Sequence, residues 1–229
     1  MKPKAVLFDL DGVLIDTMPL HARAWQAALR REGLSVDRSL IYACEGEPGH
    51  LTVERLLRNA SNGHLPADSG KRILRYKEAL FAASARHITV KPGWQQALRW
   101  LQAQLPLALV TGTSRHEVDR VVPKETLARF TAVITGDAVR RGKPHPEPYL
   151  TACRRLGVRP KDAIVIENAP YGIESARAAG AGHILALASS LPPSYLQAAD
   201  EICLTPSALR KRLRELVIGS IRREYAGKR

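Results

Sequence analysis

Apolar positions divide the chain into two kinds of segment. From about residue 88, apolar runs of strand length alternate with segments of helical period. An earlier run, AVLFDL at 5–10, has the same strand character. Alternating strands and helices are typical of a parallel sheet that helices cover on both faces. The pattern therefore predicts an α/β core, with strands at 5–10, 107–111, 131–135, 163–167 and 183–187 and helices at 93–104, 115–127, 147–157 and 171–180.

The segment after the first strand has a different pattern. Residues 17–87 contain apolar stripes of helical period at 18–34, 50–63 and 69–85, and no run of strand character. We therefore expect two domains. The α/β core is formed by residues 1–16 and 88–229, and a small all-helical cap, residues 17–87, is inserted after the first strand.

Composition narrows the class of protein. The 229 residues are 45% hydrophobic and 25% charged, which is ordinary for a globular chain, and no apolar run approaches the roughly 20 residues that span a bilayer. Asp9 ends the first apolar run too early for a signal peptide. The three widely spaced cysteines favour a reducing cytoplasm over a disulfide framework. The formal net charge of +13 suits anionic partners.

Polar residues stand where the predicted strands end. Ligands of open α/β sheets bind outside the carboxyl ends of the strands. We therefore expect one crevice to collect these residues: Asp9, Asp11, Thr111, Asp137, Glu167 and Asn168. The cap begins at the same edge and could cover the crevice.

The residue types at this edge suit phosphoryl transfer. Asp9, at a strand end, can attack phosphorus and form a covalent intermediate. Asp11 can protonate the leaving oxygen and then take a proton from water. The hydroxyl of Thr111 and the amide of Gly112 can bind phosphoryl oxygens. Lys143 can neutralise charge on the phosphoryl group and on Asp9.

Oxygen ligands for a magnesium ion stand at the same strand ends. Mg²⁺ prefers hard oxygen ligands and commonly uses one or two carboxylates together with substrate phosphate. We expect Asp9, Asp11, Glu167 and Asn168 to hold it, with main-chain carbonyl oxygen and water completing the set. Asn168 offers an amide oxygen without a full negative charge, which predicts weaker binding than an aspartate would give.

Four segments resemble the motifs of one enzyme family. DLDGVLIDT (9–17), LVTGTS (109–114), GKPHPEPY (142–149) and VIENAPYGIESARAAGA (165–181) resemble, in order, the four motifs of the haloacid dehalogenase superfamily. The resemblance implies a Rossmann-like core with a helical cap, and Mg²⁺ as cofactor. It implies Asp9 as nucleophile, Asp11 as general acid and base, and Thr111 and Lys143 as phosphoryl contacts. The dehalogenases lack the second aspartate, so Asp11 indicates phosphate chemistry.

Within the superfamily, DTMPLHARAW (16–25) resembles the phosphatase and β-phosphoglucomutase branch. This similarity implies that His21 of the cap contacts substrate. Two departures stand out. The fourth motif usually carries two adjacent acids but reads Glu167-Asn168 here. The mutase cap usually carries a phosphate-binding arginine in a loop that here reads EGEPGH (45–50), and we consider Arg115 as its substitute from the core side.

We expect a Mg²⁺-dependent phosphohydrolase that acts on a small phosphorylated metabolite through an aspartyl phosphate. A sugar phosphomutase is the alternative. A nucleic-acid-binding module is a weaker alternative, suggested by the net charge and by a basic amphipathic segment at 207–225, which we expect instead to dock on the core. No membrane partner is expected. The substrate and the oligomeric state are left open by the sequence.

Overall fold

The structure is a computed structural model that describes residues 2–47, 49–60, 66, 68–84 and 88–226, with side chains described as far as residue 219. Its centre is a six-stranded sheet in the order β3-β2-β1-β4-β5-β6, and every pairing is parallel. This is the strand order of doubly wound, Rossmann-like folds. It confirms the predicted α/β class. The strands are β1 (Ala5–Phe8), β2 (Leu107–Val110), β3 (Ala132–Ile134), β4 (Ala163–Glu167), β5 (His183–Leu187) and β6 (Glu201–Cys203).

Both faces of the sheet are buried under helices. Successive strand side chains point to opposite faces, so Val6 and Phe8 of β1 pack in one hydrophobic cluster and Ala5 and Leu7 in the other. The first cluster includes side chains of α5, α6 and α10, and the second includes side chains of α8 and α9. These core helices and their neighbour α7 are α5 (Trp94–Gln102), α6 (Arg115–Val121), α7 (Lys124–Leu127), α8 (Glu147–Leu156), α9 (Pro170–Ala178) and α10 (Pro206–Ala226).

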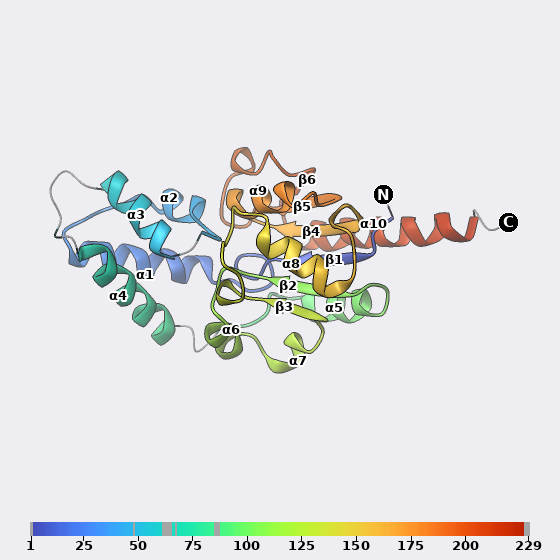
Figure 1. Cartoon of the computed structure of the whole chain (residues 1–229), viewed down its shortest axis with the longest axis horizontal. Helices are drawn as coiled ribbons and strands as arrows, with labels where there is room; N and C mark the ends of the chain where they lie inside the picture. Colours follow the sequence, from blue (N-terminus) through green and yellow to red (C-terminus); the bar gives the residue numbers. More distant parts are fainter. Residues whose placement is uncertain (1, 48, 61–65, 67, 85–87, 227–229) are drawn as a thin grey trace.

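Four helices form a separate group at one end of the sheet (Figure 1). We call this group the cap. It has a hydrophobic cluster of its own that contains Trp25, Leu29, Ile41, Leu56 and Ile73. The ends of the predicted segments at 61–63 and 85–87 lie outside the described residues. The cap helices are α1 (Met18–Arg31), α2 (Arg38–Ala43), α3 (Gly49–Ala60) and α4 (Ser69–Ser84).

The last helix, α10, docks on the core. Leu209, Leu213 and Val217 are buried in the cluster that covers the β1 face carrying Phe8. Arg212 on the same helix forms an ion pair with Glu201 of β6, with 2.6 Å between Nε and Oε2. The structure therefore favours the docked interpretation of this basic segment. Among the described residues, none of the helices is both long and apolar enough to cross a bilayer.

The register of the central strands brings their carboxyl ends level. Phe8 of β1 is the partner of Leu109 of β2 on one side and of Ile166 of β4 on the other. The residues that follow these three positions therefore emerge at one edge of the sheet. The strand order also reverses between β1 and β4, and ligands of such sheets bind at that point.

Candidate active site

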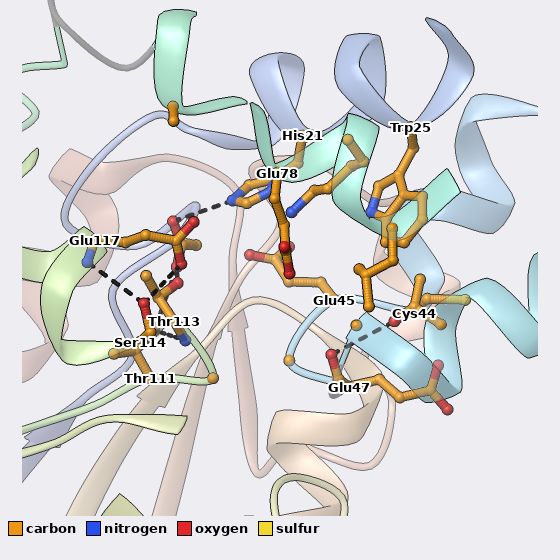
Figure 2. Close-up of a pocket in the computed structure, with 18 of the residues that line it drawn as sticks. His21, Trp25, Cys44, Glu45, Glu47, Glu78, Thr111, Thr113, Ser114 and Glu117 are labelled. Carbon is orange, nitrogen blue, oxygen red and sulfur yellow. Dashed lines mark hydrogen bonds and ion pairs between the residues drawn. The ribbon is translucent and has the colours of Figure 1, made fainter. Parts of the chain in front are cut away.

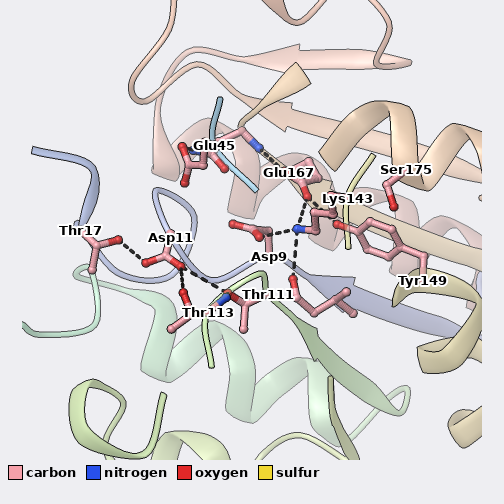
Figure 3. Close-up of polar contacts among 12 residues, drawn as sticks. Asp9, Asp11, Thr17, Glu45, Thr111, Thr113, Lys143, Tyr149, Glu167 and Ser175 are labelled. Carbon is pink, nitrogen blue, oxygen red and sulfur yellow. Dashed lines mark hydrogen bonds and ion pairs between the residues drawn. The ribbon is translucent and has the colours of Figure 1, made fainter. Parts of the chain in front are cut away.

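Lys143 lies at the centre of the strand-end edge (Figure 3). Its ammonium group donates to Asp9 Oδ1 at 2.6 Å, to Glu167 Oε1 at 2.6 Å and to the carbonyl of Val110 at 3.2 Å. The same Glu167 oxygen accepts a hydrogen bond of 2.6 Å from the hydroxyl of Tyr149, which is on α8. The Lys143 side chain is only 2% exposed, so the ammonium group is held in place by buried acceptors.

The electrostatics of this cluster follow from its burial. Burial raises the pKa of Asp9 well above its ordinary value, the Lys143 ammonium lowers it, and the charges of Glu167 and Asp11 raise it further. Burial lowers the pKa of Lys143, but the charges of Asp9 and Glu167 raise it by more. Lys143 is therefore protonated at neutral pH and partly compensates the carboxylates.

Asp11 is held by hydroxyl groups on both of its oxygens. Thr17 donates to Oδ1, while Thr113 donates to Oδ2 at 2.9 Å and Thr111 donates to Oδ2 at 3.3 Å. The Nε2 atom of His21 lies 3.7 Å from Oδ1. Burial raises the pKa of Asp11, but the nearby imidazole of His21 and the hydrogen bonds from Thr17 and Thr113 lower it to about 2. The ligand-free chain therefore holds Asp11 as a carboxylate.

A cavity of about 640 Å³ opens in front of these aspartates, lined by residues of the cap and of the core (Figure 2). The His21 ring stacks on Phe81 of α4, with 4.0 Å between ring centroids. Lys77, half-buried, lines the cavity beside them, and burial lowers its pKa. Burial and the charge of Lys77 lower the pKa of His21, although Asp11 opposes this shift. Other charged side chains in the lining are Glu45, Glu47, Arg75, Glu78, Glu117 and Arg120.

Two glycines allow the strand-end residues to pack this closely. Gly12 has a φ of 80°, a conformation that side chains rarely adopt, and a Cβ there would overlap the amide of Asn168. Gly172, on α9, lies against Glu167, and a Cβ at Gly172 would overlap the Glu167 carboxylate. Both positions therefore require glycine if Asn168 and Glu167 are to keep their places.

The loop after α2 brings the cap into contact with the core. A Cβ at Gly46 would lie 3.1 Å from Lys143 Cδ, and a Cβ at Gly112 would lie 3.2 Å from the carbonyl oxygen of Gly46. Next to this contact, Glu45 Oε2 accepts a hydrogen bond of 2.9 Å from Asn168 Nδ2. The cap therefore places one carboxyl group inside the site.

The structure brings together most residues that the sequence predicted for the site. Asp9, Asp11, Thr111, Gly112 and His21 line the cavity, and Lys143, Glu167 and Asn168 lie buried behind Asp9. Arg115 is placed elsewhere: its guanidinium pairs with Asp119 at 2.9 Å, its side chain is 55% exposed, and it is absent from the described lining of the cavity. We therefore do not retain Arg115 as a substrate contact.

Glu167 differs in detail from the prediction that it ligates a metal. One of its oxygens accepts from Lys143 and Tyr149, and the other accepts from the amide of Asn168 at 3.0 Å. Both oxygens are thus used by protein donors. The geometry shows that Glu167 helps to position Lys143, and its role as a metal ligand stays a prediction.

Four buried side-chain oxygens in the described part of the chain have no hydrogen-bond donor: Asp9 Oδ2, Asn168 Oδ1, Glu45 Oε1 and Glu47 Oε2. Buried polar atoms normally have partners, and the residues Asp9, Asn168 and Glu45 interact with one another, so their three oxygens suggest a group that binds oxygen. Within the described residues there is no cluster of three or more His, Cys, Asp or Glu side chains arranged for a metal. A set made of two carboxylates and an amide oxygen nevertheless matches the hard ligands of Mg²⁺.

Sequence reasoning missed five residues of the site. Thr17 and Thr113 lie inside the first and second motifs, and hydroxyl side chains at those positions are a signal that the sequence contains. Tyr149 ends the segment GKPHPEPY. Lys77 and Glu45 have no local signal, because only the packing of the cap against the core brings them to the cavity.

Comparisons with known proteins agree with this geometry. Residues 3–180 match the family model described as haloacid dehalogenase-like hydrolase. Hexitol phosphatase A of Escherichia coli (strain K12) is 32% identical over 194 residues, covering 82% of this chain and 84% of that protein. A phosphorylated carbohydrates phosphatase of Thermotoga maritima is 29% identical over 218 residues, covering 93% of this chain and 100% of that protein. A putative β-phosphoglucomutase from Bacteroides vulgatus has a similar structure, with a TM-score of 0.78, 29% identity and coverage of 96% and 90%.

Proposed function

The chain belongs to the haloacid dehalogenase-like hydrolases and is an enzyme of their phosphatase type. On that premise, we propose that it removes phosphate from a small phosphorylated carbohydrate or polyol through an aspartyl phosphate on Asp9. One observation carries this proposal. The Asp9 carboxylate lies at the cavity, fixed by the Lys143 ammonium at 2.6 Å, with Asp11 lining the same cavity.

The first chemical step uses Asp9 as the nucleophile. An Asp9 oxygen attacks phosphorus, the bond from phosphorus to the substrate oxygen breaks, and its electron pair stays on the leaving alcohol oxygen. Asp11 supplies the proton to that oxygen. The hydrogen bonds of the ligand-free chain favour the Asp11 carboxylate, and the negative charge of a bound phosphate monoester raises its pKa toward the protonated form.

The second step regenerates the enzyme. Asp11, now a carboxylate, takes a proton from water as that water attacks the phosphorus of the acyl phosphate. The bond from phosphorus to the Asp9 oxygen breaks, and inorganic phosphate is released. Lys143 neutralises charge on Asp9 and on the phosphoryl group in both steps. Thr111 and Gly112 line the cavity, and the Thr111 hydroxyl, once it turns from Asp11, and the Gly112 amide can donate to phosphoryl oxygens.

We propose Mg²⁺ as the cofactor. Asp9 Oδ2 and Asn168 Oδ1 are the buried oxygens that suit it, and Asp11 is a further residue that the sequence predicts for the set. The charges also fit, because the carboxyl groups of Asp9, Asp11, Glu45 and Glu167 lie close enough for their charges to interact. Lys143 pairs directly with Asp9 and Glu167, and the charge of Lys91 also acts on Asp9 and Glu45. A bound divalent ion would neutralise charge on the phosphoryl group and the carboxylates.

The cavity supports the substrate class. Its lining mixes the carboxyl groups of Glu78 and Glu117 with Lys77, His21 and the indole of Trp25. Such a surface offers many hydrogen-bond partners for hydroxyl groups. Relatives named hexitol phosphatase and phosphorylated carbohydrates phosphatase support the same class.

A phosphomutase is the second candidate, since structures named as putative β-phosphoglucomutases are 29% identical to this chain. A mutase must bind a second phosphate. The cap loop 45–50 has no arginine and instead carries Glu45 and Glu47, whose charges oppose a second phosphate. The observations therefore favour hydrolysis.

One assay decides between these functions. The full chain with Mg²⁺ is given hexitol phosphates, sugar phosphates, phosphoglycolate and nucleoside monophosphates, and separately β-glucose 1-phosphate with a hexose bisphosphate primer. We expect inorganic phosphate to form faster than glucose 6-phosphate, and kcat/KM to be highest for a polyol or sugar phosphate. Faster isomerisation would establish the mutase, and a preference for phosphoglycolate or a nucleotide would contradict the substrate class.

A further inference from the structure

The cap residue Glu45 contributes a carboxyl group to the cluster that Asp9, Asp11 and Glu167 form in the core. Glu45 lies in the loop after α2 and faces the site (Figure 3). Its Oε2 accepts from Asn168 Nδ2 at 2.9 Å. Its second oxygen, Oε1, is buried and has no donor. The carboxyl group of Glu45 lies close enough to Asp9, Asp11 and Glu167 for their charges to act on it. A carboxylate buried among other carboxylates is unfavourable unless a cation compensates it.

Asn168 offers a free oxygen atom but no negative charge. It is fully buried, and its amide oxygen Oδ1 has no hydrogen-bond partner. An amide oxygen can ligate a divalent cation, but it adds no net charge. The hydrogen bond to Glu45 also uses the Nδ2 group, so that the oxygen of the amide is the end left free.

We propose that Glu45 completes the cation site from the cap, supplying the negative charge that Asn168 lacks and fixing the Asn168 amide with its oxygen available to the metal. This inference rests on the proposed use of Mg²⁺. The cap residue Glu45 thus provides the negative charge that an acid at position 168, at the end of the strand, would otherwise provide.

A consequence is that cation binding and cap position are linked. In the structure, the loop that carries Glu45 reaches the site with Gly46 lying against Lys143 and Gly112. A cation that binds Glu45 therefore stabilises this contact, because a ligand stabilises the arrangement to which it binds more tightly.

Glu47 provides a matched control. It lies two residues further along the same loop and lines the same cavity, and its Oε2 is likewise buried without a donor, but its Oε1 pairs with Arg55 at 3.1 Å. Glu47→Gln removes the same formal charge as Glu45→Gln without touching Asn168. A general effect of cavity charge would therefore appear in both variants.

The test is calorimetric titration of Mg²⁺ alone into the full chain, without substrate. We expect Glu45→Gln to weaken Mg²⁺ binding by about tenfold and Glu47→Gln to change it by less than about twofold. The double variant Glu45→Gln/Asn168→Asp, which moves the charge to the strand end, should recover the wild-type affinity to within about threefold. Unchanged Mg²⁺ binding in Glu45→Gln, or no recovery in the double variant, would overturn the inference.

Thermal unfolding gives an independent reading. In EDTA, Glu45→Gln should unfold at the wild-type temperature or above, because it removes an uncompensated buried charge while its amide oxygen can still accept from Asn168. Added Mg²⁺ should then raise its unfolding temperature less than that of the wild type. An equal rise in both proteins contradicts the role of Glu45. A wild-type chain that binds no Mg²⁺ would instead refute the proposed cofactor, and this inference with it.

Discussion

Replacing Asp9 by asparagine is expected to abolish turnover, by roughly four orders of magnitude or more, while the fold survives. The amide cannot form an acyl phosphate, so the proposed first step is lost. Its oxygen can still accept from the Lys143 ammonium, which also keeps its bond to Glu167. The measurement is steady-state phosphate release together with thermal unfolding of the same sample.

Asp16→Asn is the matched control for this variant. Asp16 lies in the same motif but is exposed, and it is not part of the described lining of the cavity. We expect its turnover to equal that of the wild type. If a contamination-free Asp9→Asn sample keeps more than a few per cent of the wild-type kcat, Asp9 is not the nucleophile.

Replacing Lys143 by methionine is expected to reduce both stability and turnover. The ammonium group compensates the buried carboxylates of Asp9 and Glu167, each at 2.6 Å. Its removal leaves two buried acids near each other without a cation, and breaking a buried ion pair in this way costs about 3–5 kcal/mol. Urea unfolding measures this loss, and phosphate release measures the accompanying loss of charge compensation at the phosphoryl group.

The double variant Lys143→Met/Glu167→Gln separates the two effects. Removing the second charge relieves the repulsion, so we expect it to regain part of the free energy of unfolding but none of the turnover. A single Lys143→Met variant that is as stable as the wild type would contradict the stabilising role, and one that turns over at a comparable rate would contradict the role at the phosphoryl group.

The fold was predictable where its signal is local. The central strands are continuous apolar runs because both of their faces are buried, and such runs stand out in a sequence. The sequence analysis missed β6 (Glu201–Cys203) and α2 (Arg38–Ala43), because both are short and only partly buried. It also predicted one helix at 115–127, where Pro123 separates α6 from α7.

The site was predictable where strand ends determine it. Asp9, Thr111 and Glu167 lie together because three neighbouring parallel strands end level. Glu45 and Lys77 were missed because tertiary packing of the cap, and no local pattern, places them. Arg115 was chosen for its charge, whereas Asp119 one helical turn later offers it a nearer partner.

Trapping the proposed intermediate tests the central claim most directly. The wild-type chain, Mg²⁺ and a good substrate are mixed and quenched during turnover with borohydride, which reduces an acyl phosphate to the alcohol. Mass spectrometry of the digested chain then locates the reduced residue. We predict reduction of the side chain at Asp9 alone, dependent on substrate and absent from Asp9→Asn. Reduction at another carboxylate would contradict the account, as would none at Asp9 in a sample that accumulates a phosphorylated enzyme.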